Sequence, residues 1–268
     1  MKSFFFAMIL ALIAVVVEAV DLKPWYETDF ELYPRIDFLY QHYSLVDSSS
    51  GSKHRSSNDL FMTLGISGSY TPWEAWIESN FAHTRRRCFG FDNFRVAGRY
   101  QWMSDTVADP VCLTTGLILT VSTENALKDI SSFHHAIFEA EANISVGKET
   151  ICLQDWITRY WGVFGMGMGI QGYPWIRCDL AWEKKSCENL LFGLFLNSLW
   201  GLGNHSLSFH HFDGYGNVRH RSIDIGARVT KDSCWGIFSF EYAHRVYACN
   251  FPAHANLVLL RYCYPFGL

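Results

Sequence analysis

The chain has 268 residues and a formal net charge of −4, which excludes the dominant basic field that nucleic-acid binding requires. Charged residues make up 18% of the chain and the mean hydropathy is +0.03. These values are too polar for a bundle of transmembrane helices and rather apolar for a water-soluble domain. Beyond the N-terminal apolar stretch, no segment has the roughly 18 consecutive apolar residues of a membrane-spanning helix.

The N-terminus predicts a cleavable signal peptide. Lys2 precedes an apolar stretch over residues 4–17, and the small residue Ala19 follows it, which is the layout of a secretory signal. The stretch is about 14 residues long, whereas a membrane-spanning helix needs roughly 20. We therefore expect a signal peptide over residues 1–19 and one mature domain over residues 20–268.

Alternation of apolar and polar residues, the pattern of strands with two different faces, runs through the mature chain. It is clearest in residues 94–102, 138–146, 176–183 and 222–229. Weaker alternation predicts nine more strands, at residues 32–45, 60–70, 75–84, 111–122, 157–170, 190–200, 205–212, 235–247 and 256–264. Residues 190–196 are apolar on both faces and are also compatible with a helix.

The fold predicted from these segments is all-β, a single antiparallel transmembrane β-barrel of about 12 strands, with 14 as the alternative. Aromatic residues are 16% of the chain, and such rings gather where a barrel meets the two lipid interfaces. A soluble eight-stranded barrel would leave much of the chain unused. We therefore expect the apolar face to point outward and the polar face to line the lumen.

Strand parity and turns complete the predicted topology. Bacterial barrels have an even number of strands, so at least one of the thirteen candidates is wrong, and the turn pattern places the error between Arg85 and Asp155. A segment within residues 20–30 is predicted to tuck into the periplasmic mouth. Residues 47–59 are predicted as an outer loop, and residues 71–72, 203–204 and 231–233 as periplasmic turns.

Eight charged residues on the polar faces of the clearest strands are predicted to line the lumen, where they could pair across strands or face water. They are Arg95, Arg99, Glu139, Glu141, Arg177, Asp179, Asp224 and Arg228. Arginine predominates over lysine among them, which suits bidentate pairing in a confined space. Gly165, Gly167 and Gly169 share one face, which would leave room in the lumen for water or an inserted loop.

Eight cysteines lie in the mature chain and could form disulfides, although eight cysteines allow 105 pairings and the sequence selects none. They are Cys88, Cys112, Cys152, Cys178, Cys187, Cys234, Cys249 and Cys263. They serve either as cross-links within or between envelope proteins or as small apolar fillers. No CxxC pair suggests a zinc site, and no spacing around His134, His135 or residues 205–211 selects an ion. We expect neither a metal nor another cofactor.

The histidines offer one candidate catalytic pair. Ser208 and His210 share one face of the predicted strand 205–212, and a hydrolase needs such a serine and base in contact. The sequence contains no GxSxG or HExxH motif. We expect that the protein is not an enzyme, with a lipid hydrolase as the least favoured alternative.

The chain resembles Gram-negative outer-membrane β-barrel proteins of the porin type. The resemblance rests on the signal peptide, the alternating strands from Leu32 onward and the last segment, residues 257–264; the cysteine content resembles that of cysteine-rich envelope proteins of chlamydia-like bacteria. Family members end in an aromatic residue, whereas here Phe266 is followed by Gly267 and Leu268.

This resemblance implies a location in the outer membrane, in contact with its lipid. The function expected is passage of small solutes through a polar lumen, with little discrimination between anions and cations because the lumen charges are mixed. The alternative is a structural or surface-interaction barrel of the cell envelope, linked to neighbouring envelope proteins by disulfides.

Overall fold

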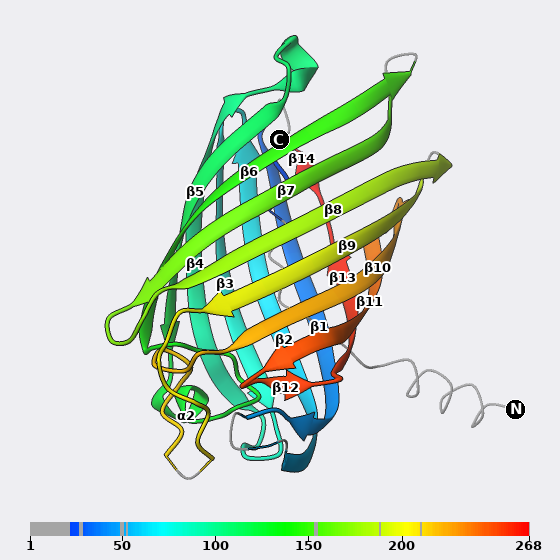
Figure 1. The fold of residues 1–268 in the computed structure, drawn as a ribbon. Helices are drawn as coiled ribbons and strands as arrows, with labels where there is room; N and C mark the ends of the chain where they lie inside the picture. The colour runs from blue at the N-terminus through cyan, green and yellow to red at the C-terminus, as the bar shows by residue number, and fades with distance from the viewer. Residues whose placement is uncertain are drawn as a thin grey trace, which may run out of the picture.

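The computed structural model describes residues 22–26, 29–48, 51, 53–152, 155–187, 189–209 and 211–267, so the predicted signal peptide lies outside the described residues. No helix among these residues is long and apolar enough to span a membrane. Most of the described chain is strand (Figure 1). The elements are β1 Glu31–Val46, β2 Lys53–Tyr70, β3 Trp73–His83, β4 Gly90–Met103, η1 Asp105–Val107, β5 Cys112–Ser122, α2 Glu124–Leu127, β6 Phe138–Cys152, β7 Asp155–Gly169, β8 Trp175–Cys187, β9 Leu190–Gly201, β10 Arg221–Ser233, β11 Gly236–Cys249, β12 Pro252–Ala253, β13 Asn256–Cys263 and β14 Phe266–Gly267.

The sheet closes on itself because β1 pairs antiparallel with β2 on one side and with β13 on the other. Every other long strand pairs antiparallel with its neighbour in the chain, so β1 to β11 and β13 form a closed barrel of twelve tilted strands (Figure 1). The short strands β12 and β14 add pairs at the two ends of β1. The predicted 12-stranded antiparallel barrel is confirmed, and residues 190–196 belong to a strand.

One of the thirteen predicted strands, at residues 205–212, was wrong. Within the described part of this segment, the only ladder contact is an isolated bridge between His205 and Val218. The alternation there has another cause, because Leu207 and Phe212 are buried in an apolar cluster with other loop residues and with residues of β1, β11 and β13. The prediction that the miscount lay between Arg85 and Asp155 was therefore also wrong, since the strands predicted there exist.

The two ends of the barrel differ in the length of their connections. At one end, residues 71–72 and 234–235 join neighbouring strands, and β14 reaches the start of β1; we call this the short-turn end. At the opposite end, which we call the long-loop end, residues 123–137 and 202–220 form the longest connections. Residues 203–204, predicted as a periplasmic turn, lie at the long-loop end, because counting a strand at 205–212 had reversed the direction of the chain.

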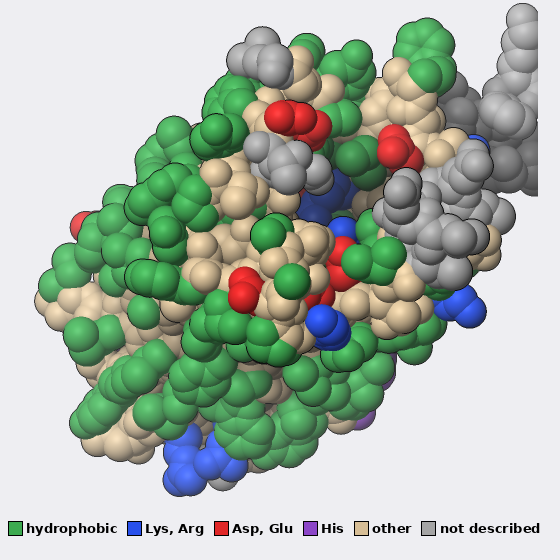
Figure 2. Space-filling model, turned by 90° about the horizontal axis from the view of Figure 1, so that it is seen from above, with side chains coloured by type: hydrophobic (Ala, Val, Ile, Leu, Met, Phe, Trp, Pro, Cys, Tyr) green, Lys and Arg blue, Asp and Glu red, His purple; other side chains and the backbone are tan. Residues whose placement is uncertain are grey.

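The exposure of side chains alternates along each strand of the wall, because successive side chains point to opposite faces. On β4, Val96 is 38% exposed, whereas the next two inward-facing positions, Ala97 and Arg99, are 4% and 2% exposed. Figure 2 looks onto the short-turn end and shows hydrophobic side chains over the outer wall, with charged side chains in and around a central hollow. The apolar face therefore points outward and the polar face inward.

Aromatic rings on the outer wall gather near both ends. Near the short-turn end, Tyr100 contacts both Trp73 and Trp102, with ring centroids 4.7 Å apart in each of these two pairs. Near the long-loop end, Phe81 contacts Phe89 and Phe91 at 5.9 and 5.7 Å. Two such girdles, separated by aliphatic side chains, are typical of barrels that span a lipid bilayer.

Candidate functional site

All eight charged residues predicted from the clearest strands face the barrel interior. Arg99, Glu139, Asp224 and Arg228 are buried, and Arg95, Glu141, Arg177 and Asp179 are partly buried. Most of them take part in ion pairs, which link Arg99 to Glu74 (2.7 Å), Arg177 to Glu141 (2.6 Å), Arg228 to Glu241 (2.7 Å) and to Glu183 (3.2 Å), Arg245 to Asp224 (2.7 Å), and Arg95 to Glu78 (3.7 Å). Arginine and carboxylate thus alternate around the lumen wall.

Further interior charges are not among the residues predicted to line the lumen, and all but Glu149 and Glu183 lie on strands with weaker alternation. They are Arg35, Asp37, Glu78, Glu149, Arg159, Glu183, Glu241, Arg245 and Arg261. A signal was present in β11, where Glu241 and Arg245 lie an even number of positions apart and therefore share a face. Charged residues at even spacing inside weakly apolar segments would have identified these positions.

Three of the ion pairs join strands that are not neighbours, and in each case a glycine on the intervening strand faces the interior beneath the pair. The arrangements are Arg35–Glu78 over Gly65, Glu141–Arg177 over Gly165, and Glu183–Arg228 over Gly193. A Cβ atom at Gly165 would lie 2.9 Å from a carboxylate oxygen of Glu141. These glycines therefore give long side chains the space to reach across a strand.

Gly165, Gly167 and Gly169 of β7 were predicted to leave space in the lumen for water or an inserted loop, and the structure shows what fills that space. Gly165 leaves space for an ion pair, and Gly167 lies against the ring of Trp175. A Cβ atom at Gly169 would meet Ala136, which belongs to the connection 123–137. An inserted loop thus fills part of the lumen at the long-loop end.

The short-turn half of the lumen contains residues 22–26 of the chain itself. The Arg99 guanidinium donates to the carbonyl oxygens of Lys23 (2.9 Å) and Leu22 (3.2 Å), and the Lys23 ammonium pairs with Glu183 at 2.9 Å. The Trp25 indole donates to Asp105 (2.9 Å). Leu22 is 1% exposed and packs in an apolar cluster with residues of the barrel wall. The expectation that the N-terminal segment enters this mouth is confirmed for these residues.

The long-loop half is covered by the connections 123–137 and 202–220, which meet over the lumen. His135 and His220 approach each other with their Nε2 atoms 3.0 Å apart, and the His135 ring stacks on Trp175 at 3.7 Å between centroids. Burial and the adjacent His135 hold the pKa of His220 well below its usual range. Tyr215 and Phe251 add apolar packing to this roof.

His134 anchors the connection 123–137 inside the barrel. Its Nε2 atom lies 2.8 Å from Asp92 and its Nδ1 atom 2.9 Å from the Ser122 hydroxyl, with all three side chains buried. The Asp92 carboxylate also accepts hydrogen bonds from Arg87 and Ser132. A carboxylate held by several donors fixes the position of the loop rather than leaving a base free to move.

The serine and histidine considered for catalysis are not brought together on a strand. Ser208 is exposed in the connection 202–220, and His210 lies outside the described residues. The shared strand face that would have brought the two side chains together does not exist, because residues 205–212 do not form a strand. Among the described residues, no group of three His, Cys, Asp or Glu side chains could hold a metal ion.

The six cysteines whose side chains are described are free thiols. They are Cys88 and Cys234, which are exposed, Cys112, which is buried, and Cys178, Cys249 and Cys263, which are intermediate. The side chains of Cys152 and Cys187 lie outside the description. Cys112 contacts the N-terminal segment, donating to the carbonyl oxygen of Pro24 at 2.8 Å. A thiol at this position acts as a small packing group with a weak donor.

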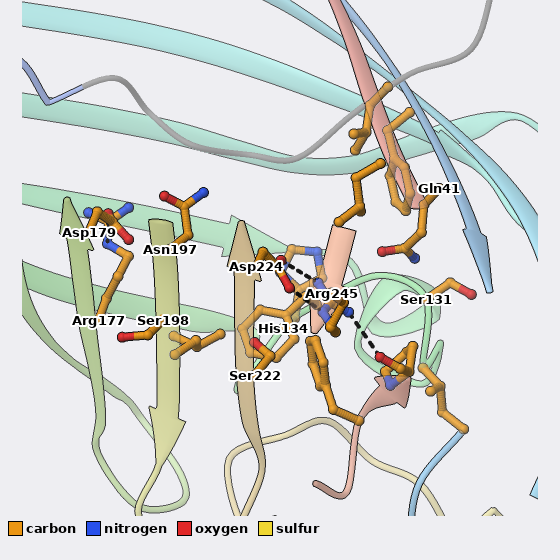
Figure 3. A pocket seen from close by; sticks show the side chains of 18 of the residues that line it. Gln41, Ser131, His134, Arg177, Asp179, Asn197, Ser198, Ser222, Asp224 and Arg245 are labelled. Carbon is orange, nitrogen blue, oxygen red and sulfur yellow. Dashed lines mark hydrogen bonds and ion pairs between the residues drawn. The ribbon is translucent and has the colours of Figure 1, made fainter. Parts of the chain in front are cut away.

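Between the N-terminal segment and the roof loops, the lumen holds a cavity of about 150 Å³. Asp179, Asn197 and Asp224 lie side by side on β8, β9 and β10 along one wall (Figure 3). Leu39 and Phe61, on β1 and β2, belong to the apolar part of the lining. A second cavity of about 120 Å³ adjoins it and shares Phe133, His134, Arg177 and Leu199.

The chain matches no protein-family model, and no curated protein is similar to it in sequence. Its fold is similar to that of an outer-membrane channel from Pseudomonas putida F1, with a TM-score of 0.70 and 9% identity over 94% of this chain and 100% of that one. The NanC porin gives a TM-score of 0.58 and 10% identity over 86% of this chain and 98% of that one. The KdgM porin gives a TM-score of 0.50 and 7% identity over 85% of this chain and 98% of that one. The fold therefore defines a porin-like β-barrel.

Proposed function

We propose that the protein is an outer-membrane channel through which small solutes pass along a polar lumen. The observation that carries the proposal is a closed barrel whose outer wall is apolar between two aromatic girdles while its interior is lined by paired charges. A β-sheet can span a lipid bilayer only when it is closed, because every backbone group must be hydrogen-bonded within the protein. Export by the predicted signal peptide would deliver the chain to this membrane.

The lumen charges indicate weak ion selectivity. Arg177 and Arg228 each lie between two carboxylates, and Arg245 holds Asp224 through two hydrogen bonds of 2.7 and 2.8 Å. Because neighbouring charges of opposite sign cancel at short range, neither cations nor anions meet a field of one sign. We expect polar solutes of low molecular mass to pass with little regard to charge.

Passage is limited by the segments inside the barrel. Residues 22–26 occupy the short-turn half and the connection 123–137 the long-loop half, so the path between the two ends is narrow. Only small solutes fit while these segments stay in place. Displacement of either segment would widen the path.

Recording from the refolded protein in planar lipid bilayers tests the proposal. We expect discrete conductance steps and, in a salt gradient, a reversal potential close to zero. A protein that inserts and shows heat-modifiable migration in detergent gels, yet conducts neither intact nor without residues 20–26, would contradict it.

The filled lumen also favours a second function, a closed structural barrel of the cell envelope. In that case Cys88 and Cys234, which are exposed among the six described cysteine side chains, are candidates for links to other envelope proteins. Non-reducing gels of whole envelopes would then show species of higher mass that disappear on reduction and in the Cys88→Ala and Cys234→Ala variants.

A further inference from the structure

We propose that the larger lumen cavity is a binding site for one small, uncharged, polyhydroxylated solute. This inference rests on the proposed channel function and names the class of solute that the channel holds on its way through. The cavity lies inside the barrel beside the connection 123–137, which contributes Ile130 and Phe133 to its lining. A solute that crosses the barrel must pass this point.

The polar wall of the cavity offers hydrogen bonds in a fixed row. Asp179, Asn197 and Asp224 are direct cross-strand neighbours, since Asn197 pairs with Asp179 on one side and with Asp224 on the other. The Asn197 carboxamide has no partner among the described residues and points into the cavity between the two carboxylates (Figure 3). It can donate and accept at once, whereas the carboxylates only accept.

The row is held in place by the side chains around it. Arg245 forms two hydrogen bonds to Asp224 through Nε and Nη2, and its Nη1 atom donates to the carbonyl oxygen of Pro252 at 3.2 Å. Arg177 lies 3.5 Å from Asp179. Preformed groups of this kind bind a solute without the entropy cost of ordering them.

Charge pairing favours a neutral solute. The carboxylate of Asp224 already has a guanidinium partner, and Asp179 lies beside another. A charged solute would lose its hydration shell in the enclosed lumen without gaining a counter-ion of its own. Hydroxyl groups lose less on desolvation, and they can donate to the carboxylates and exchange hydrogen bonds with Asn197.

The apolar lining and the volume limit the size and shape of the solute. Leu39, Phe61 and Leu257 belong to strands β1, β2 and β13, and offer contact to the C–H face of a polyol. A volume of about 150 Å³ corresponds to roughly five water molecules, which suits a polyol of roughly three to four carbon atoms. Glycerol and erythritol meet these conditions.

Equilibrium dialysis of the refolded full chain in detergent against labelled glycerol and erythritol tests the site, with glycerate and 3-amino-1,2-propanediol as charged analogues. We expect saturable binding of one glycerol per barrel, at least about tenfold weaker binding of both charged analogues, and no binding of sucrose. Asn197→Leu is expected to weaken glycerol binding about tenfold or more because it removes the central donor and acceptor. Asn197→Ser, a smaller change, is expected to weaken it less.

The matched control is Asn189→Leu, at an exposed position next to β9 at the short-turn end, which should leave binding unchanged. Heat-modifiable migration checks that each variant folds. Absence of saturable glycerol and erythritol binding, or equal binding of the charged analogues, overturns the inference. Dialysis requires no conduction, so a barrel that conducts without binding contradicts only this inference, whereas one that binds without conducting contradicts the proposed channel.

Discussion

Gly116 faces the lumen on β5, directly between Arg99 on β4 and Asn143 on β6. Arg99 passes over this glycine to reach the hydroxyl groups of Thr114 (2.7 Å) and Ser145 (3.0 Å), while it also holds the N-terminal segment. Burial of a guanidinium costs less free energy when acceptors such as these replace its water. The absence of a side chain at Gly116 is therefore a condition for the position of Arg99.

Replacing Gly116 by alanine should destabilise the barrel by about 1–3 kcal/mol, because the new Cβ would overlap the Arg99 side chain and lie 3.1 Å from Asn143 Oδ1. Urea unfolding in detergent, followed by tryptophan fluorescence, measures the change. Gly98→Ala is the matched control. Gly98 precedes Arg99 on β4 and faces outward, and no atom lies within 4 Å of the added Cβ. Equal effects of the two substitutions would contradict the role given to Gly116.

At the scale of elements, two segments that are not part of the wall decide whether the barrel is open. Residues 22–26 are held by main-chain and side-chain contacts to β4, β8 and η1. The connections 123–137 and 202–220 are held by apolar packing and by the His135–His220 contact. The wall itself is joined by continuous ladders and is expected to stay rigid.

Removal of residues 20–26 from the mature chain should raise the conductance severalfold, since the short-turn half of the lumen loses its filling. Single-channel recording in planar bilayers measures this. Lys23→Gln removes the charge that pairs with Glu183 and lies over the Trp161 ring, and should raise the frequency of openings more than their size. An unchanged conductance after the truncation would show that residues 22–26 do not narrow the path.

Acidification should loosen the roof of the lumen. The pKa of His220 is held below its usual range by burial, and the ring regains an ordinary pKa near 6.5 when the connection 202–220 is released. The released state therefore binds more protons below about pH 6.5, so docking is fully stable above that pH and weakens as the pH falls. His135 faces the same ring, and Glu139 lies 3.9 Å from His135.

Hydrogen exchange of residues 202–220, corrected for its intrinsic pH dependence, measures this effect. We expect protection to fall between about pH 7.5 and pH 5 in the native protein and to change much less in His220→Phe. His254→Phe, an exposed position in a neighbouring connection, is the control and should behave like the native protein. The opposite trend, with protection rising at acid pH, would refute the expected sign.

For the whole molecule, the lengths of the connections indicate the orientation in the membrane. Outer-membrane barrels have short periplasmic turns and longer outer loops, so the short-turn end should face the periplasm. The exposed cysteines Cys88 and Cys234 allow this orientation to be tested by chemical labelling. Cys88 lies in the connection after β3 at the long-loop end, and Cys234 lies in the turn between β10 and β11 at the short-turn end.

In intact cells, a membrane-impermeant maleimide should label a variant that retains only Cys88 and should not label one that retains only Cys234. Mass spectrometry of the purified protein measures the extent of labelling. Permeabilising the outer membrane should make Cys234 reactive, which is the control for its accessibility. Labelling of Cys234 alone in intact cells would reverse the orientation.

The sequence alone determined which long segments form the wall and how their side chains alternate, although residues 53–59, predicted as part of a loop, belong to β2. A pleated strand turns alternate side chains to opposite sides, so the distribution of Arg95, Val96, Ala97 and Arg99 is a local property that needs no knowledge of the fold. The prediction of about twelve strands followed from thirteen such segments and the even number that bacterial barrels have. The inward direction of the eight charged residues was predicted from the length of the chain and its aromatic content, because alternation does not tell which face is inside.

Only the tertiary structure decided what fills the barrel and which charges meet. Residues 205–212 alternate like a strand, but their apolar side chains are buried by packing against Tyr43 and Phe251, which lie far away in sequence. The ion pair between Asp37 and Arg261 and the contact between His135 and His220 likewise exist only because β1 closes against β13 and the loops fold inward. Alternation reports the surroundings of one strand, whereas ring closure brings together groups from opposite ends of the chain.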